Sequence, residues 1–223
     1  MRPKLATAAF LAVLTLLTGP AILTAAPAHA AARRDPVVLI HGYNSSPATW
    51  NTLVQRLTAA GYDAADIHRF GYDYRVSNVT TAALLADYIA AIGAPHVDLV
   101  GHSMGALIAR YYVKNLNGTR TVDELISLAG PHHGTRTLAI CSFDPSCREM
   151  LPGSAFLRTL NAGDETPGAV EYRTFYSKCD LLILPYTSAL LNGAENTNAG
   201  CIGHTEFRLV DSVAKALIAE LKD

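Results

Sequence analysis

The sequence predicts an α/β fold in which a mostly parallel central sheet is covered by helices on both faces. Short apolar runs rich in β-branched residues alternate with helical patterns at short intervals, and such alternation produces right-handed βαβ crossovers. The chain has 223 residues, of which 50% are hydrophobic, and this is enough to bury a full core. Because no internal repeat or second composition block interrupts the pattern, we expect a single domain over residues 31–223.

The first half of this domain reads as strand, helix, strand, helix. PVVLI at residues 36–40 is an apolar run of the kind found in strands that are buried on both faces. The pattern is helical from 47 to 60, where Gly61 stops it. Residues 66–70 form a weaker strand pattern, and residues 80–93 carry apolar side chains at helical spacing before a terminal glycine.

The second half continues the alternation. VDLV at residues 97–100 predicts a strand, and ALIARYYVKNL at 106–116 predicts the helix that follows it. ELISLAG at 124–130 and VEYRTFYS at 170–177 predict later strands. TEFRLVDSVAKALIAEL at 205–221 predicts the closing helix.

The N-terminus has the pattern of a secretory signal peptide over residues 1–30. Arg2 and Lys4 give it a basic start, residues 5–25 are mostly apolar, and Ala28-His29-Ala30 supplies small residues before a cleavage site. A membrane anchor is the alternative, but glycine and proline residues interrupt the apolar stretch. We therefore expect cleavage after Ala30 and a secreted, extracellular protein.

The charge balance and the cysteines narrow the class of protein further. Eighteen basic and nineteen acidic residues give a net charge of −1, so nothing favours nucleic acid as a partner. In an oxidising compartment four cysteines would form two disulfides, and three pairings are possible. The nearest neighbours along the chain are Cys141 with Cys147 and Cys179 with Cys201. No metal-ligand spacing is present, so we expect no metal and no cofactor.

The segment LVGHSMGALIARYY at residues 99–112 is the strongest functional signal. Ser103 stands between Gly101 and Gly105, directly after a buried-strand pattern and directly before a helical one. The motif G-x-S-x-G alone is weak, and an ordinary surface turn before an amphipathic helix is the alternative. The strand-turn-helix setting favours a nucleophile elbow, in which glycines make room for a serine on strained backbone.

HVDLVGHSMGALIARYYVKNL together with PVVLIHGY resembles the small secreted bacterial triacylglycerol lipases of the α/β-hydrolase superfamily. The likeness covers most of the mature chain and is strongest over 36–135 and around 170–207. It implies the α/β-hydrolase fold and an extracellular carboxyl-ester hydrolase with a serine nucleophile, a histidine base, an aspartate and two backbone amides that bind the oxyanion. Residues 131–169 alone could fold over the site, so we expect a minimal lid or none.

The superfamily order of serine, acid and histidine along the chain selects Ser103, Asp180 and His204. His204 lies in GCIGHTEF just before the last helix, where the family carries its catalytic histidine. Asp180 follows the strand at 170–177 and should emerge at the carboxyl edge of the sheet beside the serine. The less suitable candidates are His132 and His133, which follow a strand and would shape the site wall, and Asp123, Asp144 and Asp164.

The oxyanion donors are expected to be the backbone N–H groups of Tyr43 and Met104, with His41 in a structural role. The predicted reaction is attack of Ser103 on a lipid ester or similar ester by a monomer in transient contact with a lipid–water interface. A polyester or cutin hydrolase, an acyltransferase and a non-catalytic binding relative of the same fold remain alternatives.

Overall fold

The computed structural model describes residues 34–221 of the chain. The predicted signal peptide lies outside the described residues. Within this range no helix has the length and apolar character needed to cross a lipid bilayer.

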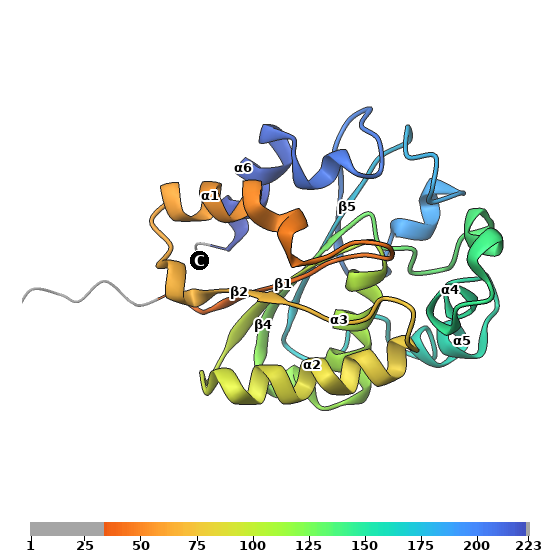
Figure 1. Cartoon of the computed structure of the whole chain (residues 1–223), viewed down its shortest axis with the longest axis horizontal. Helices are drawn as coiled ribbons and strands as arrows, with labels where there is room; N and C mark the ends of the chain where they lie inside the picture. Colours follow the sequence, from red (N-terminus) through yellow and green to blue (C-terminus); the bar gives the residue numbers. More distant parts are fainter. Residues whose placement is uncertain (1–33, 222–223) are drawn as a thin grey trace, which may run out of the picture. The chain divides into compact units, whose positions relative to one another are not determined.

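Six parallel strands form one central sheet in the spatial order β2-β1-β3-β4-β5-β6 (Figure 1). The parallel sheet predicted from the sequence is therefore confirmed. The strands are β1 (Val37–Ile40), β2 (Ile67–Phe70), β3 (Val97–His102), β4 (Val122–Leu128), β5 (Glu171–Tyr176) and β6 (Glu195–Asn198).

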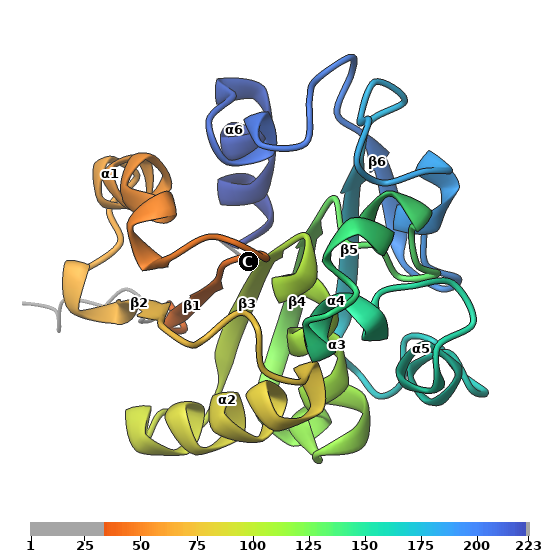
Figure 2. The same cartoon turned by 45° about the vertical axis from the view of Figure 1, so that its right-hand side comes forward.

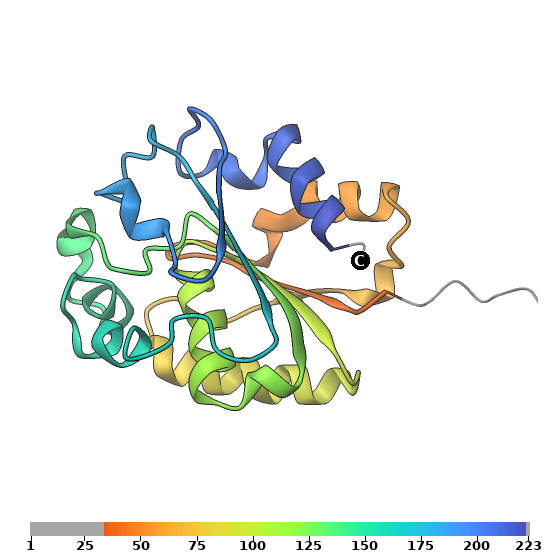
Figure 3. The same ribbon diagram turned by 180° about the vertical axis from the view of Figure 1, so that it is seen from behind.

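Helices cover both faces of the sheet, as expected. Figures 1 and 3 show α1 and α6 together on one face and α2 and α3 on the other. The α-helices are α1 (Asn51–Ala59), α2 (Asn78–Ile92), α3 (Met104–Asn115), α4 (Pro145–Glu149), α5 (Ala155–Leu160) and α6 (Asp211–Glu220). Three short 3₁₀ helices border the site, namely η1 (Pro47–Trp50), η4 (Arg136–Cys141) and η6 (Glu206–Arg208).

The first strand shows why its sequence is apolar without alternation. Val38 and Ile40 belong to the core on the α2 and α3 face, whereas Val37 and Leu39 belong to the core on the α1 and α6 face. Successive side chains of a strand point to opposite faces, so a strand covered on both sides needs apolar residues at every position. All four residues are completely buried.

The edge strand β6 is absent from the sequence-based prediction. Its sequence, Glu-Asn-Thr-Asn, has no apolar residue, and its burial pattern is exposed throughout except at Thr197. It pairs with β5 alone, from Arg173 opposite Glu195 to Tyr176 opposite Asn198 (Figure 2). Backbone pairing at an edge requires no buried side chain, so hydrophobic patterning could not detect this strand.

The helix predicted over 205–221 is divided in the structure into two shorter helices. The structure has η6 at Glu206–Arg208 and then α6 from Asp211, with Leu209 and Val210 between them outside either helix. The loop that carries His204 therefore continues into a 3₁₀ turn, which packs beside the site, before the long closing helix begins.

Acidic side chains gather at the amino edge of the sheet, opposite the edge where Ser103 lies. Asp98 on β3 is only 7% exposed. Burial, together with the negative charges of Glu124, Asp35 and Asp123, raises the pKa of Asp98 to about 8. Burial likewise raises the pKa of Glu124 to about 7, against the opposing hydrogen bond from Arg173. These carboxyl groups are therefore held partly protonated near neutral pH.

We predict that Asp98→Asn flattens the pH dependence of stability. The folded pKa of about 8 lies above the unfolded value, so the stabilising contribution of the protonated acid is lost as pH rises from about 4 to about 8. The slope is at most about 1.4 kcal/mol per pH unit for one group. Urea unfolding at pH 5 and pH 8 should show a smaller loss of stability in Asp98→Asn than in the wild type. The exposed Asp87→Asn is the control, and equal slopes in all three proteins would contradict the prediction.

Candidate active site

Ser103 occupies a sharp turn between β3 and α3. Its backbone has φ 55° and ψ −123°, a conformation that side-chain-bearing residues rarely adopt. The N–H of Ser103 donates to the carbonyl of Leu128 at 2.8 Å, which ties the turn to the neighbouring strand β4. The residue is 8% exposed, so its hydroxyl has limited access to solvent. This geometry matches the strand-turn-helix setting predicted for the motif.

Two glycines allow this turn to form. A Cβ at Gly105 would lie 2.2 Å from the carbonyl oxygen of Ile40, and one at Gly101 would lie 2.5 Å from the backbone nitrogen of Ala106. Both distances are shorter than any real contact, so helix α3 can begin this close to β1 and β3 only if both positions lack a side chain. The spacing of the motif is therefore a packing requirement around Ser103.

His204 and Asp180 lie side by side, although they come from different loops. The Nδ1–H of His204 donates to Oδ2 of Asp180 at 2.7 Å. The other carboxylate oxygen accepts the N–H groups of Leu182 and Ile183 at 2.8 and 3.1 Å. Burial alone would raise the pKa of Asp180, but the bond and charge of His204 and the two N–H bonds outweigh it and lower the pKa. An ionised carboxylate therefore orients the imidazole.

Ser103 and His204 line the same cavity, which has a volume of about 340 Å³. Within residues 34–221 no hydrogen bond joins the hydroxyl of Ser103 to His204, although both side chains face this space. Catalytic hydrogen bonds are often long when no substrate is bound. The cavity is lined by Gly42, Tyr43, Asn44, Ser45, His102, Ser103, Leu138, Leu182, Ile183, His204, Thr205 and Arg208.

The backbone N–H groups of Tyr43 and Met104 are the oxyanion donors expected from the sequence. In the part of the chain that the structure describes, neither donates to a protein acceptor. His41, which stacks on Tyr72, donates its Nδ1–H to the carbonyl of Gly42 at 2.9 Å. Because C=O and N–H point in opposite directions in a trans peptide, this bond turns the N–H of Tyr43 away from His41. His41 thus orients the loop, as its structural role predicts.

His102 is a site residue that the sequence reasoning missed. Its ring is buried beside Ser103, and its Nε2–H donates to the backbone carbonyl of His204 at 2.9 Å. Burial, with the nearby charges of His204 and Arg208, lowers the pKa of His102 well below its usual value, so the ring is neutral. Its ring also contacts the ring of His204, with the two centroids 4.8 Å apart. Its position next to Ser103 in the motif was the available signal.

None of the other candidates lines the cavity, although one of them is bonded to a residue that does. His132 is fully buried and hydrogen-bonded to the hydroxyl of Ser127 at 2.8 Å. His133 pairs with Glu165 at 2.9 Å on the surface. Asp123 pairs with His96 at the amino end of β4. Asp144 accepts a hydrogen bond from the hydroxyl of Tyr43 at 2.6 Å and so belongs to the wall of the site.

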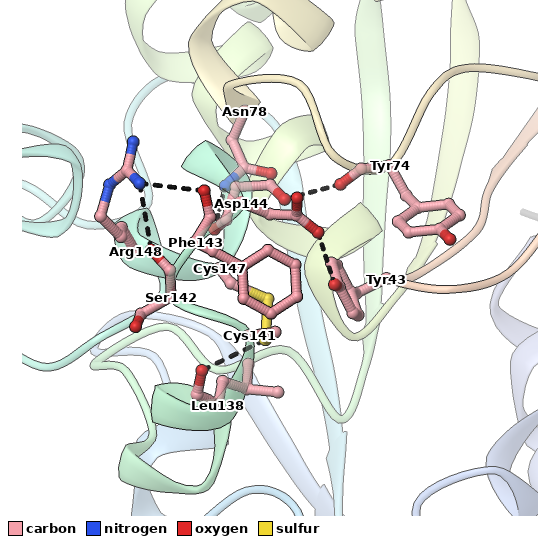
Figure 4. The surroundings of a disulfide bond; sticks show 11 residues. Tyr43, Tyr74, Asn78, Leu138, Cys141, Ser142, Phe143, Asp144, Cys147 and Arg148 are labelled. Atoms are coloured by element: carbon pink, nitrogen blue, oxygen red, sulfur yellow. Dashed lines mark hydrogen bonds between the residues drawn. A yellow bond between two sulfur atoms is a disulfide. The ribbon is translucent and has the colours of Figure 1, made fainter.

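Two disulfides join the nearest neighbours among the four cysteines. Cys141–Cys147 closes a short loop between η4 and α4 (Figure 4). Asp144 lies within this loop and accepts the hydrogen bond from the hydroxyl of Tyr43. Cys179–Cys201 joins the loop of Asp180 to the loop of His204. The second bridge therefore links the segments that carry the two hydrogen-bonded side chains.

Exposed apolar side chains lie close in sequence to the cavity-lining residues Leu138 and Leu182. Ile140 is 87% exposed and Phe143 74% exposed, and both belong to the segment that the sequence marked as a candidate lid. That segment contributes Leu138 alone to the cavity lining. Its Thr137 hydroxyl donates to the carbonyl of Leu182 at 2.5 Å, so it contacts the loop after Asp180. We call Ile140, Phe143, Leu181, Leu182 and Leu184 the apolar rim.

Within residues 34–221 no group of three or more His, Cys, Asp or Glu side chains could hold a metal ion.

Solved structures with a similar fold include lipases. The mature lipase BlEst2 of Bacillus licheniformis has a TM-score of 0.71 at 19% identity, over 85% of this chain and 94% of that one. Lipase B of Aspergillus fumigatus has a TM-score of 0.73 at 20% identity, over 85% of this chain and 52% of that one. At these identities the likeness concerns the fold, and it confirms the expected α/β-hydrolase architecture.

Sequence comparison gives the family. The Mycoplasma genitalium protein named "Putative esterase/lipase 3" is 33% identical over 101 residues, which are 44% of this chain and 37% of that curated relative. Residues 34–201 match the family described as Lipase (class 2). This match covers well over half of the chain and includes Ser103 and Asp180. The chain therefore belongs to the class 2 lipase family.

Proposed function

We propose that the chain is a secreted serine carboxyl-ester hydrolase that cleaves acylglycerols or similar lipid esters. The observation that carries the proposal is the pair His204–Asp180, bonded at 2.7 Å, on the same cavity as Ser103. A serine hydroxyl becomes an effective nucleophile when a base takes its proton and a third group holds that base in the correct tautomer. The family match supports an ester as the substrate.

In the proposed reaction Ser103 Oγ attacks the ester carbonyl while His204 Nε2 accepts the hydroxyl proton. Asp180 keeps the Nδ1–H of the ring engaged, so Nε2 is the free basic nitrogen. The same Nε2 then gives the proton to the departing alcohol, and an acyl-enzyme on Ser103 remains. Water, deprotonated by His204, releases the acid and restores the serine.

The negative charge that forms on the carbonyl oxygen is bound by the N–H groups of Tyr43 and Met104. The two donors come from different elements, one from the loop after β1 and one from the first turn of α3. The positive end of the helix dipole adds to the attraction at Met104. Such fixed donors need no reorganisation when the charge develops, and one of them is commonly worth a factor of about 10²–10³ in rate.

The apolar rim supports contact with a lipid–water interface. Large side chains exposed around a cavity mark a surface that gains free energy on leaving water. Both disulfides and the signal-like N-terminus support export, with a mature single domain beginning after Ala30. The proposed enzyme thus works outside the cell as a monomer with a small lid segment.

We expect Ser103→Ala to fold normally and to lose about a millionfold in kcat, because the three side chains act as one unit. Asp180→Asn should lose about 10⁴-fold, because an amide cannot hold the correct tautomer of His204. The assay is hydrolysis of a soluble p-nitrophenyl ester, with Asp164→Asn as the control for loss of a surface carboxylate.

A serine-directed organophosphonate should give an adduct on the peptide that contains Ser103 in the wild type and none in Ser103→Ala. Near-normal activity in Ser103→Ala, or an adduct on another serine, would refute the proposed mechanism.

Replacing the apolar rim should affect lipid emulsions selectively. Burying a Phe or Ile side chain contributes about 1.5–3 kcal/mol, so Ile140→Ser with Phe143→Ser should lower the ratio of emulsion rate to soluble-ester rate at least about tenfold. Leu84→Ser, which removes an exposed leucine from α2, is the matched control and should leave this ratio unchanged. An unchanged ratio in the double variant would show that the apolar rim does not contribute to binding at the lipid–water interface.

The Cys179–Cys201 bridge should contribute to catalysis as well as stability. Cys179→Ala with Cys201→Ala should destabilise the fold by roughly 3 kcal/mol and lower kcat by up to about a hundredfold, because small misplacements of a catalytic group are costly. Assays are made well below the melting temperature of the variant.

Cys141→Ala with Cys147→Ala is the control, since that bridge joins neither catalytic loop. If the first double variant melts earlier but keeps full kcat while folded, the bridge is structural only.

A further inference from the structure

The cavity around Ser103 is lined by an apolar group and a polar group of side chains, which come from different segments. Leu138, Leu182 and Ile183 come from the lid segment and from the loop after Asp180. Asn44, Ser45, Thr205 and Arg208 come from the loop before η1 and from the turn that contains η6. Two lining residues are hydrogen-bonded to neighbouring segments: the Tyr43 hydroxyl donates to Asp144 in the disulfide loop, and Arg208 donates to the carbonyl of Thr49 in η1 at 3.4 Å.

Arg208 has no counter-ion. Within residues 34–221 no carboxylate lies within ion-pair distance of its guanidinium, and its Nε is buried without an acceptor. Its one hydrogen bond, to Thr49, is long. Burial lowers its pKa, yet a guanidinium stays protonated in proteins. In contrast, Arg173 at the sheet edge contacts four carboxylates. Burying a cation without a counter-ion costs folding free energy. A ligand that supplies a negative charge in the cavity would offset this cost.

The direction of proton transfer in ester cleavage places Arg208 near the alcohol part of the substrate. The departing alcohol oxygen takes its proton from His204 Nε2, so the alcohol lies against the His204 loop. Thr205 continues that loop into η6, which ends at Arg208. The acyl chain is then left to the apolar lining residues, which include Leu138 and Ile183.

Resting on the proposed hydrolase function, we propose that Arg208 binds an anionic group, phosphate or carboxylate, on the alcohol part of the substrate. A planar guanidinium matches both groups with two parallel N–H···O bonds. The substrate class narrows to esters of acidic alcohols, such as acylated glycerol phosphates.

The test compares two soluble butanoate esters of equal size, one of 3-hydroxybenzoate and one of 3-hydroxybenzamide. A charge-assisted hydrogen bond changes affinity about tenfold to a hundredfold, so the wild type should prefer the acid ester and Arg208→Gln should lower the acid-to-amide ratio of kcat/KM by at least about tenfold. Arg208→Lys should keep part of the ratio. Arg120→Gln, which removes an exposed arginine far from the cavity, should keep all of it.

The outcomes separate this inference from the hydrolase proposal. If neither ester is cleaved by the wild type, the hydrolase proposal fails and the inference falls with it. If both are cleaved and Arg208→Gln leaves the ratio unchanged, the inference alone is wrong.

A second measurement needs no variant and so does not depend on the folding of Arg208→Gln. Glycerol 3-phosphate should competitively inhibit cleavage of the amide ester by the wild type, and glycerol at the same concentration should not. Inhibition by inorganic phosphate as strong as that by glycerol 3-phosphate would contradict the assignment of the anion to the alcohol part. Absence of inhibition by glycerol 3-phosphate would overturn the inference.

Discussion

The close approach of helix α3 to the backbone of β1 is the constraint on which the rest of the site depends. No loop separates β3 from α3, so a single residue, Ser103, must reverse the chain. That reversal forces the positive φ of Ser103 and excludes a side chain at Gly101 and Gly105. It also leaves the N–H of Met104 in the first turn of a helix, where helical geometry provides no acceptor. The position of Ser103, its backbone strain and the free N–H of Met104 follow from one packing contact.

The parallel sheet then determines which loops can bring side chains close to Ser103. All strands end at the same edge, so the loops after β1, β3, β5 and β6 meet there regardless of their separation in sequence. Asp180 follows β5, and His204 follows β6. Loops of this length would hold side chains loosely by themselves, and the Cys179–Cys201 bridge and the bond from His102 to the His204 carbonyl reduce that freedom. The hydrogen-bonded pair of Asp180 and His204 is thus positioned by contacts outside the pair.

Local patterns predicted much of this architecture, and long-range contacts account for what they missed. Val37 to Ile40 could be recognised as a doubly buried strand, and Gly101-x-Ser103-x-Gly105 as an elbow, because each depends on neighbours in sequence. The roles of Ser103, Asp180 and His204 remain proposals that the geometry supports. Strand β6, His102, Arg208 and the Tyr43–Asp144 bond had no local signal strong enough to predict them. Each of these features depends on a contact with a residue that is distant in sequence and becomes a neighbour only in the folded chain.

The small ring closed by Cys141 and Cys147 has a consequence for the entropy of surface binding. Phe143 projects from a segment that is joined at both ends by the disulfide and fixed at Asp144 by the hydroxyl of Tyr43 (Figure 4). Most of the conformational freedom of this segment is therefore lost during folding, before Phe143 meets any surface. A preorganised side chain of this kind retains more of its transfer free energy than one on a loop that must become ordered on contact.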